Sequence, residues 1–86
     1  MKFKYLVVLV SNNHSTLLYK NLLRKGCEID LISAPSNIAR GCTKAIRFDE
    51  SDTNIVVQEI KNNKLIIKGI YKIVNESNGT SYVLIS

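Results

Sequence analysis

The stretch FKYLVVLV, at residues 3–10, decides the fold of this chain. Its apolar residues fall at both odd and even positions, which is typical of a central strand that is buried on both faces. The apolar run is too short to cross a bilayer, and no small-residue cleavage site follows it. We therefore predict a buried strand in a cytoplasmic protein that has no membrane segment.

Three further elements are predicted directly after this strand. Polar residues 11–13 suit the start of a helix, and residues 14–25 place several leucines on one face before Gly26 ends the helix. The segments at residues 28–33 and 42–48 are then predicted as two strands.

The second half of the chain adds a helix and a hairpin. Asp49 is the predicted cap of a helix that runs to about residue 63. Strands are predicted over residues 65–74 and 80–85, and the Asn-Gly pair at residues 78–79 is a strong hairpin signal between them. No linker or repeat divides the chain, so we expect one domain over residues 1–86.

This order of elements, β-α-β-β-α-β with one extra strand, predicts an α+β protein of the ferredoxin-like class. The antiparallel sheet would have the strand order 4-1-3-2, with the fifth strand beside the fourth and two helices on one face. The other face would be uncovered although the first strand is apolar on both sides. We therefore expect a homodimer that forms through that face.

The composition limits the classes of function. The 86 residues carry a net charge of +5, and the basic residues are spread along the chain. A solvated basic surface is favoured over a nucleic-acid site, since the first and third strands lack the exposed aromatic pair that stacks RNA bases. No phosphate-binding loop or catalytic carboxylate pair occurs, which favours a carrier or binding protein without a cofactor over an enzyme.

The predicted topology brings two separate segments to one edge of the sheet. The first and third strands are antiparallel neighbours, so the start of the first helix and the start of the third strand meet there. The helix start contributes Asn13 and His14, and the strand start contributes Arg40, Gly41 and Cys42. These five residues form the candidate site.

Cys42 is the candidate for chemistry at this edge. The positive end of the helix dipole, His14 and Arg40 would lower the pKa of its thiol and favour the thiolate, which is the nucleophilic form. The helix start near Asn13 would bind a thiolate or another anion, and Gly41 would let the backbone approach closely. The open alternative is a cysteine that only fills space, beside an idle His14.

The second cysteine, Cys27, follows the first helix and lies at the opposite edge. A strand of about six residues spans roughly 20 Å, whereas a disulfide needs Cα atoms within about 7 Å, so we expect no bond between Cys27 and Cys42. One histidine and two cysteines also give too few soft ligands for a metal site. We interpret Cys27 as a core residue.

A family resemblance is carried by His14, Pro35, Cys42 and the strand end Arg47-Phe48-Asp49. On these residues the chain resembles the DUF3343 family of selenium/sulfur carrier-like proteins, over roughly residues 5–73. The resemblance implies a protein that carries sulfur or selenium on Cys42 between a donor and an acceptor protein. Thr43 and the Arg40-Gly41 pair depart from the usual family pattern around the cysteine.

Two functions are open at this point. The first is a carrier that uses the single thiol of Cys42. The second is a ferredoxin-like interaction or regulatory module that dimerises or binds a small ligand and uses no cysteine chemistry. The pKa of the Cys42 thiol would discriminate between them.

Overall fold

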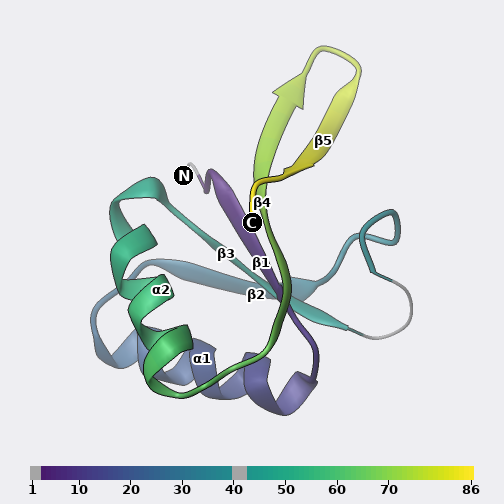
Figure 1. Cartoon of the computed structure of the whole chain (residues 1–86). Coiled ribbons are helices and arrows are strands. Elements are labelled where there is room, and N and C mark those ends of the chain that lie inside the picture. The colour runs from purple at the N-terminus through teal and green to yellow at the C-terminus, as the bar shows by residue number, and fades with distance from the viewer. Residues whose placement is uncertain (1–2, 40–42) are drawn as a thin grey trace.

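The strands and helices of the chain assemble around one central strand (Figure 1). The computed structural model describes residues 3–39 and 43–86. Its strands are β1 (Tyr5–Leu9), β2 (Ile29–Ser33), β3 (Lys44–Phe48), β4 (Ile67–Glu76) and β5 (Gly79–Leu84), and its helices are α1 (Asn12–Arg24) and α2 (Thr53–Asn62). A 3-10 turn, η1 (Glu50–Asp52), precedes α2. This arrangement confirms the predicted α+β, ferredoxin-like class.

β1 lies in the middle of the sheet, as its two-sided apolar pattern predicts. The strand order is β2-β3-β1-β4-β5, and each neighbouring pair is antiparallel. Val7 illustrates the register, since it lies opposite Ile46 of β3 on one side and Ile70 of β4 on the other. The predicted order 4-1-3-2, with the fifth strand beside the fourth, is therefore confirmed.

The main core lies between the sheet and the two helices, which cover the same face (Figure 1). Fully buried side chains meet there from β1, α1 and α2, namely Val7, Leu9, Leu18, Leu22 and Val56. The four-residue spacing of Leu18 and Leu22 places both on the face of α1 that contacts the sheet. Burial of one such side chain contributes about 1.5–3 kcal/mol.

The opposite face of β1 is also buried, which differs from the predicted uncovered face. Leu6 and Val8 have no exposed area and pack with Ala45 of β3. Ala39, from the segment between β2 and β3, and Tyr82 of β5 pack against the same cluster. Since the chain itself covers Leu6 and Val8, these residues supply no exposed patch for a second copy, and the homodimer stays a prediction.

The β4–β5 hairpin extends away from the helices (Figure 1), and its turn lies within the predicted range 75–79 but is shorter. Glu76 pairs with Gly79, which leaves Ser77 and Asn78 as the turn residues. Gly79 has a φ of 138°, a conformation that L side chains rarely adopt. The glycine is therefore needed where β5 begins rather than inside the turn.

Capping side chains set where the helical segments begin. Ser11 Oγ accepts a hydrogen bond from the His14 N–H at 3.1 Å, so α1 starts two residues earlier than predicted. Asp49 accepts from the Glu50 N–H at 2.8 Å, which confirms it as a cap, but it opens η1 and α2 begins only at Thr53. Neither helix in the described residues is long and apolar enough to cross a membrane.

Candidate functional site

Side-chain hydrogen bonds join the start of α1 to the start of β3. Asn12 Oδ1 accepts from the Lys44 backbone N–H at 3.0 Å. The fully buried hydroxyl of Ser15 donates to the Ser11 carbonyl oxygen at 3.2 Å, and the Lys44 carbonyl oxygen is a second acceptor at 3.5 Å. The two segment ends that the topology predicts at one sheet edge therefore lie together in the structure.

Three of the five predicted site residues, Arg40, Gly41 and Cys42, lie outside the described residues. The described residues on either side of these three, Ala39 and Thr43, are held in place by contacts with other parts of the chain. The Thr43 carbonyl accepts a hydrogen bond from the Ala34 N–H at 2.8 Å, just before β3 begins. Ala39 is buried in the cluster that contains Leu6 and Val8.

Asn13 and His14 are the predicted site residues that the structure describes, and both lie in the first turn of α1. The Asn13 side chain is exposed, whereas His14 is half-buried. His14 Nδ1 accepts a long hydrogen bond from the Ile66 N–H at 3.5 Å, which ties α1 to the segment that leads into β4. Because an accepting ring nitrogen carries no proton, the proton of the neutral ring lies on Nε2, which is then a donor.

The start of α1 carries the positive end of the helix dipole without a compensating acid. No acidic residue lies in the first turn of α1. The aligned peptide dipoles amount to about half a positive charge at this end. Ser11 Oγ accepts a hydrogen bond from one N–H group of this first turn, that of His14. An anion at this sheet edge would therefore meet a favourable electrostatic field.

Cys27 lies just after α1, in surroundings of the opposite kind. It is a free thiol, 6% exposed, in the main core. Burial raises the pKa of this thiol, and the neighbouring Asp52 carboxylate raises it further. Cys27 therefore keeps its proton, and its interpretation as a core residue is confirmed.

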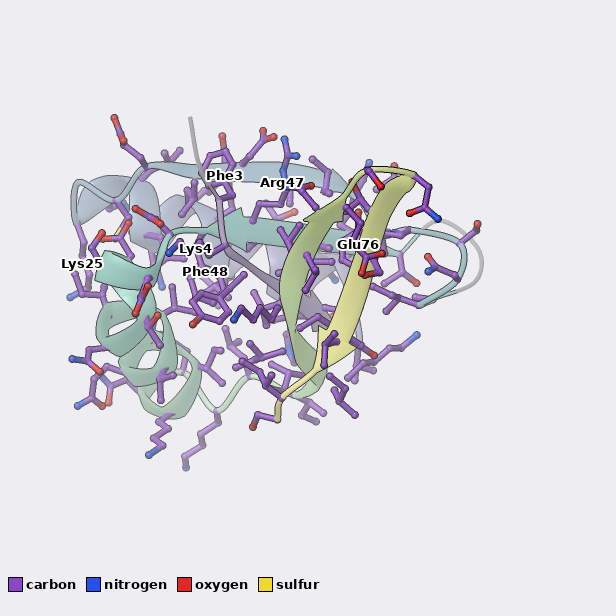
Figure 2. The ribbon with its side chains drawn as sticks, turned by 90° about the horizontal axis from the view of Figure 1, so that it is seen from above. Phe3, Lys4, Lys25, Arg47, Phe48 and Glu76 are labelled. Carbon is purple, nitrogen blue, oxygen red and sulfur yellow. The ribbon has the colours of Figure 1, made fainter. Side chains whose placement is uncertain are left out.

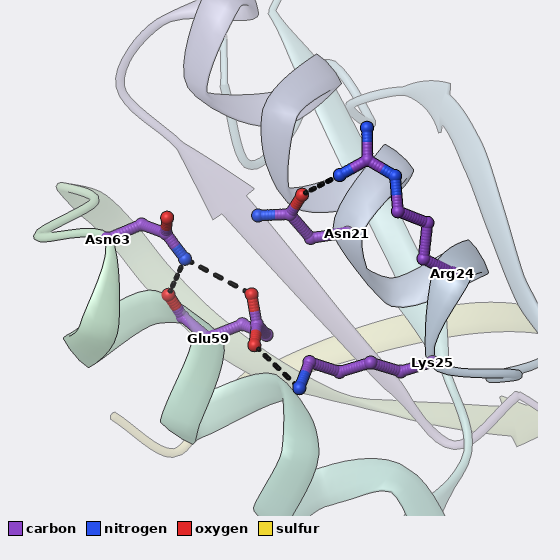
Figure 3. Close-up of polar contacts among 5 residues, drawn as sticks. All are labelled: Asn21, Arg24, Lys25, Glu59 and Asn63. Carbon is purple, nitrogen blue, oxygen red and sulfur yellow. Dashed lines mark hydrogen bonds and ion pairs between the residues drawn. The ribbon is translucent and has the colours of Figure 1, made fainter.

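A polar network beside Cys27 fastens the end of α1 to α2 (Figure 3). Lys25 Nζ lies 3.2 Å from Glu59 Oε2, and the Asn63 side-chain amide donates to Glu59 Oε1 at 3.1 Å. The Glu59 side chain is only 8% exposed, and a buried carboxylate requires such partners. Among residues 3–39 and 43–86, no group of three or more His, Cys, Asp or Glu side chains could hold a metal ion.

Sequence reasoning missed the roles of Asn12 and Ser15 in joining α1 to β3. A signal existed for Ser15, which lies three residues before Leu18 and seven before Leu22. A hydroxyl on that apolar stripe indicates a buried polar contact. The partner of Asn12 leaves no such signal, because 32 positions separate it from Lys44 and only the sheet brings the two together.

Comparison with known proteins identifies the family of the chain. The family model described as "Putative Se/S carrier protein-like" matches residues 4–72, which include β1, the joined starts of α1 and β3, and most of the remaining sheet. A search of curated proteins found no match, and neither did a search of solved structures. The resemblance seen in the sequence is thus confirmed. Because the match covers well over half of the 86 residues, the chain belongs to the Se/S carrier protein-like family.

Proposed function

We propose that the protein carries sulfur or selenium on the thiol of Cys42, as a persulfide or its selenium counterpart. The observation that best supports this role is the hydrogen bond from the Lys44 N–H to Asn12 Oδ1. It holds the first turn of α1 beside the chain two residues after Cys42, and that turn presents the positive end of the helix dipole to an anion. Membership of the family supports the same role.

The transfer involves no net oxidation. The Cys42 thiolate attacks the outer sulfur of a donor persulfide, so that an S–S bond to Cys42 forms while the S–S bond to the donor breaks. The donor leaves as a thiolate with the electron pair of the broken bond. A nucleophile of the acceptor then attacks the outer sulfur on Cys42, and the Cys42 thiolate is released.

The other four candidate residues, Asn13, His14, Arg40 and Gly41, would accommodate the negatively charged thiolate or persulfide. In this proposal His14 donates from Nε2, a role that its Nδ1 contact with Ile66 supports because that contact leaves the proton on Nε2. Asn13 and the helix start stabilise the anion, Arg40 attracts it, and Gly41 lets the backbone approach the sulfur.

The partners in this proposal are one protein that donates sulfur or selenium and one that accepts it. Both must reach the same outer sulfur atom, so both bind at the sheet edge where α1 begins. We place the exchange in the cytoplasm, because a reducing compartment keeps both cysteines as thiols.

Mass spectrometry of cysteine peptides tests this proposal. The reduced protein is incubated with sodium polysulfide, alkylated and digested, alongside the Cys42→Ser and Cys27→Ser variants. We expect one added sulfur atom on the Cys42 peptide of the wild type and of Cys27→Ser, and none in Cys42→Ser. Equal labelling of Cys27, or labelling that persists in Cys42→Ser, would overturn the carrier role.

The pKa of the Cys42 thiol separates the carrier from its alternative. A carrier thiol at a helix start has a pKa below the ordinary thiol value of about 8.5. A value at or above the ordinary one would favour an interaction or regulatory module that uses no cysteine chemistry. The rate of alkylation of Cys27→Ser as a function of pH measures it, because that variant retains only the one thiol.

A further inference from the structure

A pocket lies at the base of the β4–β5 hairpin, at the other end of β1 from the start of α1. Its volume is about 420 Å³, which is within the usual range for small-molecule sites. Phe3 and Lys4 contribute from the chain before β1, and Arg47 contributes from β3. The hairpin contributes Ile73 and Tyr82, so three separate parts of the chain build the pocket.

The strand register shows which side chains share the face of the sheet on which the pocket lies. Arg47 lies opposite Leu6, whose side chain belongs to the cluster away from the helices. Ile73 lies opposite Tyr82, and both pack against that same cluster. Glu76, labelled in Figure 2, lies three residues beyond Ile73 and therefore points to the other face of the hairpin. The carboxylate of the hairpin is thus directed away from the pocket.

The pocket is basic, and its cations are only partly neutralised. No acidic residue is among its lining residues in the described part of the chain. Lys4 Nζ lies 3.5 Å from a Glu50 carboxylate oxygen, but both side chains are more than half exposed, so the pair is weak. Arg47 pairs through one terminal nitrogen with Asp30, while its Nε is buried without a hydrogen-bond partner. An anion in the pocket would therefore gain both charge and donors.

Aromatic side chains accompany these cations. The guanidinium carbon of Arg47 lies 5.2 Å from the centre of the Phe3 ring, and Figure 2 shows the two side by side. Tyr82 adds a half-buried ring on the hairpin side. We propose that this pocket binds a small organic anion, in which a carboxylate or phosphate contacts Lys4 and Arg47 and a planar ring packs against Tyr82.

This site is separate from the proposed carrier site in both place and sequence. The two lie at opposite ends of β1, since Lys4 precedes the strand and α1 follows it. The family match ends at residue 72, before the hairpin residues Ile73 and Tyr82. The pocket therefore depends on a part of the chain that the family match does not include, and binding there requires no cysteine.

Amide chemical shifts of the full chain, recorded by NMR during titration with phenyl phosphate and separately with benzoate, test the proposal. Phenol and inorganic phosphate serve as probes that retain only the ring or only the anion. We expect saturable shifts at Phe3, Lys4, Arg47 and Tyr82 with at least one of the two aromatic anions, and weaker binding of both partial probes. The aromatic anion that binds with the lower Kd shows whether the pocket prefers a phosphate or a carboxylate.

Three variants, each of which removes one charge, test the proposal further. Arg47→Gln removes charge-assisted hydrogen bonds, which are worth about 1.5–3 kcal/mol, so Kd should rise at least about tenfold. Asp30→Asn frees the guanidinium and should lower Kd about two- to fivefold. Lys61→Gln, at an exposed position of α2, removes the same positive charge away from the pocket and should change Kd by less than about twofold.

The same spectra show whether each variant is folded, so a loss of binding is distinguished from a loss of structure. Shifts scattered over the whole surface, or an equal loss of affinity in Lys61→Gln and Arg47→Gln, would overturn the proposal. So would the absence of binding by both aromatic anions. The Cys42→Ser variant should bind as the wild type does, which separates this result from the outcome for the carrier role.

Discussion

The two ends of α1 differ in what they offer a nearby cysteine. At the start, Asn12 binds the Lys44 N–H two residues after Cys42, and no acidic side chain lies in the first turn. Just past the end, Cys27 is buried, and the carboxylate of Asp52 adds to the effect of burial in raising the pKa of its thiol. The helix dipole adds to this difference, because its positive end faces the first region and its negative end the second.

The comparison shows that the two ends of α1 offer different surroundings, and that Cys27 lies next to the end that disfavours a thiolate. Near the end of α1 the buried Glu59 is matched by Lys25 and Asn63, so its polar groups already have partners in the fold. At the start of α1 Ser11 supplies a cap, and the first turn of the helix contains no acidic residue. A negative charge would therefore be stabilised near the start of α1 and disfavoured near its end.

The largest expected effect is on the alkylation of the two cysteines in the native protein. Cys27 is buried and should react only when the core opens, which costs several kcal/mol, so iodoacetamide should modify Cys42 at least about a hundredfold faster. Peptide mass spectrometry over time measures both rates in one sample. In urea the two alkylation rates should become similar. If the rates were already similar in the native protein, the contrast between the two cysteines would be wrong.

A smaller effect is expected from removal of the cap at the start of α1. Ser11→Ala should lower the free energy of unfolding by about 1 kcal/mol and slow the alkylation of Cys42, because the first turn loses the bond that orders it. Thr16→Ala is the matched control, since Thr16 is exposed on the same helix, and it should change stability by less than about 0.5 kcal/mol. Urea unfolding measures both variants, and equal losses would contradict the importance of the cap.

The smallest expected effect is the dependence of stability on pH through Cys27. Burial raises the folded-state pKa of this thiol above its unfolded value, so its contribution to stability is complete below the ordinary thiol pKa of about 8.5. As the pH rises through the raised pKa, the unfolded chain loses the proton first and stability falls. Cys27→Ala should show a shallower fall at alkaline pH in urea unfolding, and an unchanged slope would show that Cys27 does not contribute.

Periodicity and topology rules predicted most of the fold, and the errors have specific physical causes. The Asn-Gly pair marked a hairpin but not its register, because the pairing of Glu76 with Gly79 moves the turn to Ser77 and Asn78. The buried second face of β1 could not be predicted, since Tyr82 and other distant residues supply its cover. The pairing of Arg47 with Asp30 and its contact with Phe3 depend on strand neighbours that local patterns do not reveal.

For the candidate site, the sequence by itself determined which segments meet, because antiparallel neighbours and a helix crossover leave few arrangements of β1, α1 and β3. It also determined the family, through His14, Pro35 and Cys42 and through Arg47-Phe48-Asp49 at the end of β3. Only the tertiary structure decided the role of Asn12 and the pocket that Arg47 shares with the hairpin. The physical reason is that hydrogen bonds and pockets depend on atoms far apart in the chain, whereas periodicity reports only which side of its own element a residue occupies.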